Sequence, residues 1–325
     1  MRYEPRLDGL RAIAAIVVVA FHARVPFMNG GFLGVDIFFV LSGYLITRLL
    51  VEEYQATGRI HYRSFMARRL LRLYPALLLT LVVYAILSPW LYPQYDATTH
   101  YRDIALSGLY LTDYARAFGV PASILSHTWS LSVEVHFYFL WPLVLIFIMK
   151  LPKRQMQLAL VLLWVSATFW RWQIFPFEDW RILYERTDTH CSGLILGSLL
   201  ATVKPKNSKA ISIAGLGIIS IAVVFFQWRT NATTLIGFSL AEIGAAMTII
   251  AAPQWMGYGL LTWIGKMSYG LYLWHYPVIR VLRNMETSWQ ISFLLALLLG
   301  LLFATISYYL VEQRFIKRRK YLIKG

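Results

Sequence analysis

The sequence predicts an all-α, polytopic membrane protein, and three observations support this fold class. Hydrophobic residues make up 58% of the 325 residues and charged residues only 14%, and the mean hydropathy is +0.56. Soluble globular domains are less apolar and carry roughly 25% charged residues. The apolar residues also gather in ten runs near the length of about 20 residues that a membrane-spanning helix needs. We therefore predict a membrane helical bundle of about ten transmembrane helices, forming one domain over residues 1–325.

The ten runs follow one another along the whole chain. In order they are Leu10–Val25, Phe32–Leu50, Leu70–Leu91, Ser130–Met149, Leu158–Phe175, Thr187–Val203, Ile211–Trp228, Leu235–Ala252, Leu260–Val281 and Ile291–Val311. The first run is short, and Arg11 extends from it to the membrane interface. Basic residues precede this run, as in a signal peptide, but no small-residue cleavage site follows. We interpret it as a retained first helix.

Two connections between the runs carry predictions of their own. The link 51–69 is rich in charge and is expected to contain an interfacial helix. In the long connection 92–128, the segment Ile104–Phe118 is short and polar, so we interpret it as interfacial or re-entrant. If this segment crossed, the number of spans would be eleven and the two termini would lie on opposite sides.

The basic residues predict the orientation. With ten spans, 22 of the 31 Lys and Arg residues fall on the side of the termini, including all nine Lys. Short cytoplasmic loops are enriched in Lys and Arg, so both termini are predicted to be cytoplasmic. The net charge of +15 is then a topology signal, and we predict no nucleic-acid partner. The single cysteine, Cys191, allows no intrachain disulfide and argues against a thiolate metal site, so no metal is predicted.

Ionisable groups inside apolar runs are costly and are therefore functional hypotheses. Arg11 and His22 are eleven residues apart, which places them on one helix face about 16 Å apart along the axis. His22, Glu134 and Asp188 all lie near the predicted outer ends of their runs, together with His190, and are expected to share one outer cavity. A histidine with a carboxylate neighbour is the minimal general base with an orienting partner.

Each of these groups also has a structural interpretation that spacing alone leaves open. His22 could be a histidine hydrogen-bonded within the bundle. Glu134 could be a carboxylate favoured by a helix N-terminus. Asp36 lies just inside the second apolar run.

Two further groups of residues are candidates for binding. Arg69 and Arg72 lie three residues apart, on one helix face at the cytoplasmic entrance of the third run. Two such guanidinium groups suit phosphates, although the spacing taken alone favours positive-inside anchors. In the ninth run, Ser268, Tyr269 and His275 place polar groups inside apolar sequence. A following proline would bend this helix around a cavity.

Taken together, these patterns resemble the acyltransferase-3 family of integral membrane acyltransferases, of the type that O-acetylates surface polysaccharides. The segments that carry the resemblance are Leu7-Asp8-Gly9-Leu10-Arg11 with His22 eleven residues after Arg11, Gly34–Thr47, Arg69-x-x-Arg72 with Pro75, Trp129-Ser130-Leu131 with Glu134 and Tyr138, Ser268-Tyr269 to His275-x-Pro277, and Val311-Glu312. They occur in the expected order over almost the whole chain.

The resemblance implies a membrane-bound O-acyltransferase of the bacterial inner membrane. The donor would be acetyl-CoA or another acyl-CoA from the cytoplasm, with no permanently bound cofactor. The acceptor would be a hydroxyl of a cell-surface glycan or a lipid-linked sugar. His22 would act as the catalytic base, with Glu134 assisting electrostatically.

The remaining candidates would support these two groups. Arg11, Arg69 and Arg72 would bind the donor, and Asp36, Ser268, Tyr269, His275 and Asp188 would be supporting polar groups. The oligomeric state is not predicted.

Three alternatives stay open at this level. Mechanistically, His22 could carry the acyl group itself as an acyl-histidine. The acceptor could instead be a small molecule such as a macrolide. In a different class of protein, a secondary transporter would also have about ten spans and buried ionisable groups.

Overall fold

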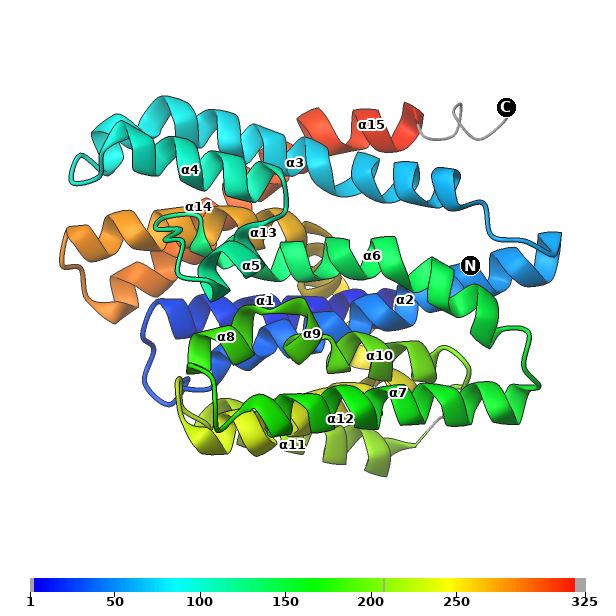
Figure 1. The fold of residues 1–325 in the computed structure, drawn as a ribbon. Helices are drawn as coiled ribbons and strands as arrows, with labels where there is room; N and C mark the ends of the chain where they lie inside the picture. The colour runs from blue at the N-terminus through cyan, green and yellow to red at the C-terminus, as the bar shows by residue number, and fades with distance from the viewer. Residues whose placement is uncertain (1–2, 207, 319–325) are drawn as a thin grey trace.

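The computed structural model describes residues 3–206 and 208–318, and this part of the chain is helical without any strand. The α-helices are α1 Pro5–His22, α2 Gly34–Thr57, α3 Tyr62–Leu91, α4 Ala97–Gly108, α5 Thr112–Ala117, α6 Trp129–Ile148, α7 Lys153–Ile174, α8 Trp180–Glu185, α9 Thr187–His190, α10 Ser192–Leu200, α11 Lys209–Phe225, α12 Phe238–Ile250, α13 Gly259–Asn284, α14 Trp289–Ser307 and α15 Gln313–Arg318. The long helices form one bundle, with α3 and α4 along one side and α7, α11 and α12 along the other (Figure 1). Helices α1 and α2 run between these two sides.

The all-α class is confirmed, and a helix overlaps each of the ten predicted runs. Five helical segments are long and apolar enough to cross a membrane: Gly31–Thr57, Tyr62–Leu91, Ser126–Ile148, Thr233–Ile250 and Trp289–Phe315. The count of ten spans and the cytoplasmic side of both termini stay predictions. The prediction about the termini concerns residues that lie partly outside the described part of the chain.

The outer faces of the bundle expose large apolar side chains. In the most apolar 18-residue stretch of Tyr62–Leu91, only 28% of the stretch is buried within the protein. In the corresponding stretch of Trp289–Phe315, the buried share is 22%. The exposed residues include Leu78, Val82 and Ile86 on α3. Water-soluble monomers rarely expose contiguous apolar surfaces of this kind. These faces therefore suit contact with lipid.

The predicted interfacial helix in 51–69 is wrong as a separate element. Helix α2 instead continues to Thr57, and α3 already begins at Tyr62. Gly58 ends α2 with a φ of 70°, and its N–H donates to the Tyr54 carbonyl at 2.8 Å. Glycine adopts this left-handed conformation without a steric cost, which allows so short a connection.

The segment 104–118 forms parts of two short helices, α4 and α5. They are separated by residues 109–111, where Tyr110 has a φ of 55°. The buried carboxylate of Asp103 in α4 accepts hydrogen bonds from the backbone N–H groups of Ser123, Ile124 and Leu125 at 2.7 to 3.1 Å. It thereby fixes the loop that leads into α6. This connection positions the start of α6 beside the site described below.

Helix α1 packs closely against its neighbours through glycines. A Cβ atom on Gly265 of α13 would lie 1.8 Å from the Asp8 carbonyl oxygen. One on Gly9 would lie 2.0 Å from the Met256 carbonyl oxygen. Small residues let helix backbones approach each other in membrane bundles. Because α1 lies against α13 along its length, the two helices can place side chains opposite one another.

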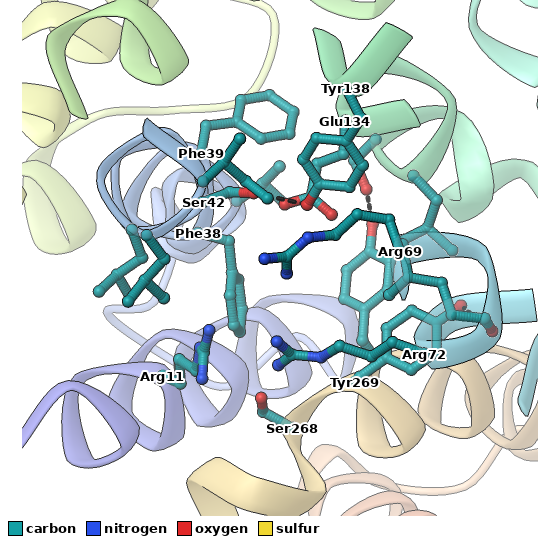
Figure 2. A pocket seen from close by; sticks show the side chains of 18 residues that line it. Arg11, Phe38, Phe39, Ser42, Arg69, Arg72, Glu134, Tyr138, Ser268 and Tyr269 are labelled. Carbon is teal, nitrogen blue, oxygen red and sulfur yellow. Dashed lines mark hydrogen bonds between the residues drawn. The ribbon is translucent and has the colours of Figure 1, made fainter. Parts of the chain in front are cut away.

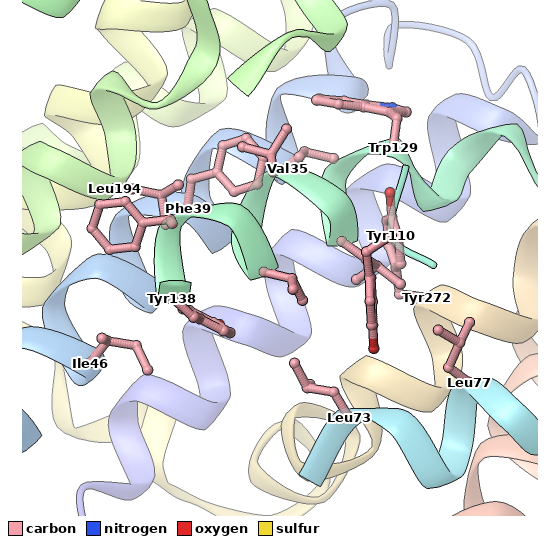
Figure 3. Packing of buried hydrophobic residues seen from close by; sticks show 14 of the residues in the cluster. Val35, Phe39, Ile46, Leu73, Leu77, Tyr110, Trp129, Tyr138, Leu194 and Tyr272 are labelled. Carbon is pink, nitrogen blue, oxygen red and sulfur yellow. The ribbon is translucent and has the colours of Figure 1, made fainter. Parts of the chain in front are cut away.

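Apolar and aromatic side chains from α2, α3, α6, α10 and α13 fill the centre of the bundle. Figure 3 shows this packing, with Phe39 against Leu194 on one side and Leu73 and Leu77 on the other. Trp129 and Tyr272 belong to the same cluster. These side chains form the apolar core at the centre of the bundle.

Candidate active site

The first of two neighbouring cavities, here the arginine cavity, is lined by three arginines. Arg11 comes from α1, and Arg69 and Arg72 come from α3. Figure 2 shows their guanidinium groups converging on one space. The cavity holds about 810 Å³ of empty space, including its opening to solvent. The structure thus brings together the three residues that the sequence predicts for donor binding.

One carboxylate in the lining faces the arginines. Glu134 of α6 interacts electrostatically with Arg11 and Arg72, and its hydrogen-bonding neighbours are Ser42 and Tyr138. The hydroxyl oxygens of Ser42 and Tyr138 are 2.6 Å apart. Glu134 is therefore held in a polar network on the wall of the arginine cavity (Figure 2).

The remaining polar lining comes from α13. Ser268 and Tyr269 both line the arginine cavity, and the Tyr269 hydroxyl donates to the Leu73 carbonyl at 2.9 Å. Arg11 also pairs with the buried Asp8 at 2.9 Å. Three guanidinium groups still outnumber the carboxylates around the cavity. Such an excess of fixed positive charge suits phosphate groups, which guanidinium binds through paired hydrogen bonds.

The second cavity, here the histidine cavity, lies at the C-terminal end of α1. It holds about 1070 Å³ of empty space, including its opening to solvent. It is lined by Phe21, His22, Arg24, Phe32, Val35, Arg116, Ser126, His127, Trp129, Tyr184, Glu185, Trp228, Tyr272, Tyr276 and Arg283. Aromatic rings make up much of this wall, and they offer flat apolar faces beside polar groups.

His22 is half-buried and is held from several directions. Its Nδ1 atom lies 3.1 Å from Nε2 of His275, which is fully buried on α13. The Tyr276 ring packs edge-to-face against the His22 ring, with centroids 4.8 Å apart. Arg283 donates a hydrogen bond to the His22 carbonyl oxygen at 2.5 Å. His22 is thus an oriented imidazole at the wall of an open cavity.

His127 is a cavity residue that the sequence reasoning missed. Its ring stacks on Tyr276 with centroids 4.8 Å apart and lies 5.9 Å from the His275 ring. The predicted fourth run begins at Ser130, so His127 falls in the preceding loop. The sequence did contain a signal for it. If the predicted fourth helix had begun one turn earlier, it would have included His127 and the polar residues beside it.

A buried ion pair forms another part of the histidine cavity wall. Glu185 accepts hydrogen bonds from Arg116 at 2.7 and 2.8 Å. Burial raises the pKa of the Glu185 carboxyl, and the Arg116 guanidinium acts in the opposite direction. The pair neutralises one positive charge of the cavity. Arg24 and Arg283 line the same cavity with no carboxylate within ion-pair distance among the described residues.

The two cavities adjoin each other. Val35 of α2 and Tyr272 of α13 line both of them. The Tyr272 hydroxyl is 2.7 Å from the Ser130 hydroxyl and 2.7 Å from the His127 carbonyl oxygen, so this side chain is fixed at the boundary. Helix α1 runs past both cavities, with Arg11 lining one and His22 lining the other.

This arrangement corrects the expected pairing of His22 with Glu134. Trp129, at the start of α6, lines the histidine cavity, whereas Glu134 lines the arginine cavity. Five residues of helix advance about 7.5 Å along the axis, which carries Glu134 past the boundary between the cavities. The two groups do not face one cavity, and no hydrogen bond joins them in the described part of the chain.

The other acidic candidates lie away from both cavities. Asp36 and His190 form a fully buried pair, with Oδ1 and Nε2 2.8 Å apart. Asp188 pairs with Arg186 at 2.6 Å and accepts a hydrogen bond from Trp170 at 2.9 Å. The expected outer cavity shared by His22, Asp188 and His190 is therefore not found. These contacts instead tie α9 to α2 and α7.

The amino-acid sequence is similar to a known family and to known proteins. A family model described as an acyltransferase domain matches residues 4–312. O-acetyltransferase OatA from Staphylococcus aureus strain NCTC 8325 / PS 47 is 33% identical over 98% of this chain. The proteins of the same name from strains COL and MRSA252 are also 33% identical over 98% of this chain. The chain spans 58% of the length of these relatives. No solved structure matches it significantly.

Proposed function

The chain belongs to this acyltransferase family, and from that premise we propose that it is a membrane-bound O-acetyltransferase. It takes an acyl group, acetyl in the first instance, from acyl-CoA and transfers it to a hydroxyl of a cell-surface glycan or glycolipid precursor. The observation that carries the proposal is the pair of adjoining cavities, one lined by three arginines and the other by an oriented histidine. The membrane is the cytoplasmic membrane of a bacterium.

The donor occupies the arginine cavity. Arg11, Arg69 and Arg72 bind the phosphates of coenzyme A, because guanidinium groups pair with phosphate oxygens through two parallel hydrogen bonds. The acyl group is attached to the end of a long pantetheine arm. That arm carries the thioester past Val35 and Tyr272 towards His22. Glu134, Ser268 and Tyr269 shape the wall along which the donor lies.

The acceptor occupies the histidine cavity. Aromatic rings such as Trp228 and Tyr184 suit the apolar faces of sugars, and the nearby arginines and hydroxyls suit their polar groups. His22 takes the proton from an acceptor hydroxyl as its oxygen attacks the thioester carbonyl. The new C–O bond forms, the C–S bond breaks, and the proton passes from His22 to the departing thiolate.

The test is consumption of radiolabelled acetyl-CoA by the purified protein in liposomes that contain lipid-linked sugar acceptors. We expect the wild type to consume the donor and His22→Gln to lose about 100-fold or more of the activity, the usual contribution of a general base. His136→Gln is the matched control, because His136 contacts Thr187 and lines neither cavity. Equal activity in the wild type and His22→Gln would contradict the proposed role.

Binding and trapping measurements separate the alternatives. Absence of coenzyme A binding by the folded protein would support a transporter instead. Label recovered on a peptide containing His22 after rapid quenching would support the acyl-histidine route over direct attack.

A further inference from the structure

A chain of hydrogen bonds ends at His22. The Nδ1 atom of His275 lies 3.1 Å from the carbonyl oxygen of Leu271, one turn earlier in α13. The Nε2 atom of His275 lies 3.1 Å from Nδ1 of His22. His275 is fully buried and lines neither cavity. Its two ring nitrogens are therefore both committed to contacts inside the protein.

The first contact decides where the proton of His275 resides. A carbonyl oxygen can only accept, so Nδ1 of His275 must donate to Leu271. A neutral imidazole has one N–H group, which makes Nε2 of His275 an acceptor. His275 has no carboxylate partner among the described residues, and a buried unpaired charge is costly. The neutral form is therefore the one that fits this position.

The second contact then decides the proton position of His22. Nδ1 of His22 must donate to the acceptor nitrogen of His275 and so carries the proton. In this tautomer the Nε2 atom of His22 carries a lone pair. Because Nδ1 faces the buried His275 and His22 lines the histidine cavity, we place Nε2 towards that cavity. The edge-to-face contact with Tyr276 holds the ring in that orientation.

We infer that His275 is a positioning residue that fixes His22 as the Nδ1-protonated tautomer and presents its Nε2 lone pair to the acceptor. A neutral histidine thus takes the orienting place that the sequence assigned to the carboxylate of Glu134. The inference rests on the proposed function, in which His22 is the base. The inference requires that His275 accept a hydrogen bond from His22, whereas a purely structural histidine would not need to do so.

Nitrogen-15 NMR of the histidine-labelled, substrate-free protein tests the tautomer without any reaction. His22→Gln identifies the His22 resonances by their loss. We expect a protonated Nδ1 and an unprotonated Nε2 for His22 in the wild type. A protonated Nε2 would overturn the inference. Because this spectrum needs no turnover, it stands or fails separately from the acyltransferase assignment.

Two substitutions at His275 test the consequence for activity. His275→Gln keeps an acceptor oxygen near the position of Nε2, so we expect transfer within about tenfold of wild type and a retained Nδ1–H signal on His22. His275→Phe keeps a ring but removes the acceptor, so we expect kcat to fall about 100-fold with the KM for acetyl-CoA unchanged. Wild-type kcat in His275→Phe, or equal losses in both variants with the His22 signal unchanged, would overturn the inference.

Discussion

Individual arginines differ in what they face, although their sequence context is similar. Arg68, Arg69 and Arg72 lie within one turn and a half of α3, yet only the last two line the arginine cavity. Arg68 instead reaches Glu53 at 3.4 Å. Only Arg69 and Arg72 are therefore placed to bind the proposed donor, whereas the position of Arg68 fits the general preference for positive charge near the cytoplasmic surface.

Arg69→Gln and Arg72→Gln are each expected to weaken acetyl-CoA binding by about 10- to 100-fold. A hydrogen bond to a charged group contributes roughly 1.5–3 kcal/mol, and about 1.4 kcal/mol corresponds to a tenfold change in Kd. Isothermal titration of the detergent-purified protein measures the Kd. Arg68→Gln is the control and should bind as the wild type does. Unchanged affinity in both cavity variants would return Arg69 and Arg72 to the role of membrane anchors.

At this scale the sequence predicted single residues better than it predicted pairs. The spacing of Arg11 and His22 placed both on one helix, and the structure shows each of them lining a cavity. The partner of His22 was not predictable in the same way. His275 comes from 253 residues further along the chain, and only the packing of α1 on α13 brings the two together. No spacing rule within a helix carries that information.

The distance between helices α1 and α13 determines how the site is assembled. Gly265 allows the backbone of α13 to touch α1 at Asp8, and the same two helices carry His275 and His22. A side chain at this contact has no room, because the nearest obstacle is backbone and not a flexible side chain.

Gly265→Ala is expected to destabilise the protein by about 1–3 kcal/mol through overpacking and to lower kcat by separating α1 from α13. Thermal unfolding in detergent and the acetyl-CoA assay measure the two effects. Gly217→Ala is the control, because no atom lies within 4 Å of a Cβ at this exposed position of α11. It should leave activity unchanged, since alanine favours a helix over glycine. A Gly265→Ala protein as stable and active as the wild type would show that the close contact is dispensable.

Helices were predicted from apolar runs, but their interruptions were not. The sixth run is divided at Cys191 between α9 and α10, and Ile104–Phe118 is divided at residues 109–111. Hydrophobicity averaged over a run carries no information about such breaks. They depend on tertiary contacts, such as the buried pair of Asp36 with His190 at the end of α9.

For the whole molecule, the distribution of Lys residues predicts which ends of the bundle face the cytoplasm. In a Cys191→Ser background, a single cysteine at Lys206 is expected to react with a membrane-impermeant maleimide only after the membrane is opened. A single cysteine at Phe177 should react in intact cells, because it follows α7 at the predicted outer end and is exposed. The same labelling at both positions in intact cells would contradict the predicted topology.

The adjoining cavities connect that topology to function. The arginine cavity lies at the end of the bundle where Arg68 pairs with Glu53. His22 lies three helical turns from Arg11 along α1. In the proposed function the acyl group passes between the cavities, and Val35 and Tyr272 line both of them. Amino-acid composition predicted a membrane bundle, but this internal path follows only from how α2 and α13 are placed.

The most direct test of this passage is to narrow it at Val35. Val35→Trp in liposomes should retain acetyl-CoA affinity, because the arginines are untouched, and should lose acyl transfer by at least about 100-fold, a loss comparable to removal of the base. Val35→Leu is the control for substitution at this position and should keep most of both properties. Transfer at the wild-type rate by a folded Val35→Trp protein that still binds the donor would contradict passage of the acyl group between the two cavities.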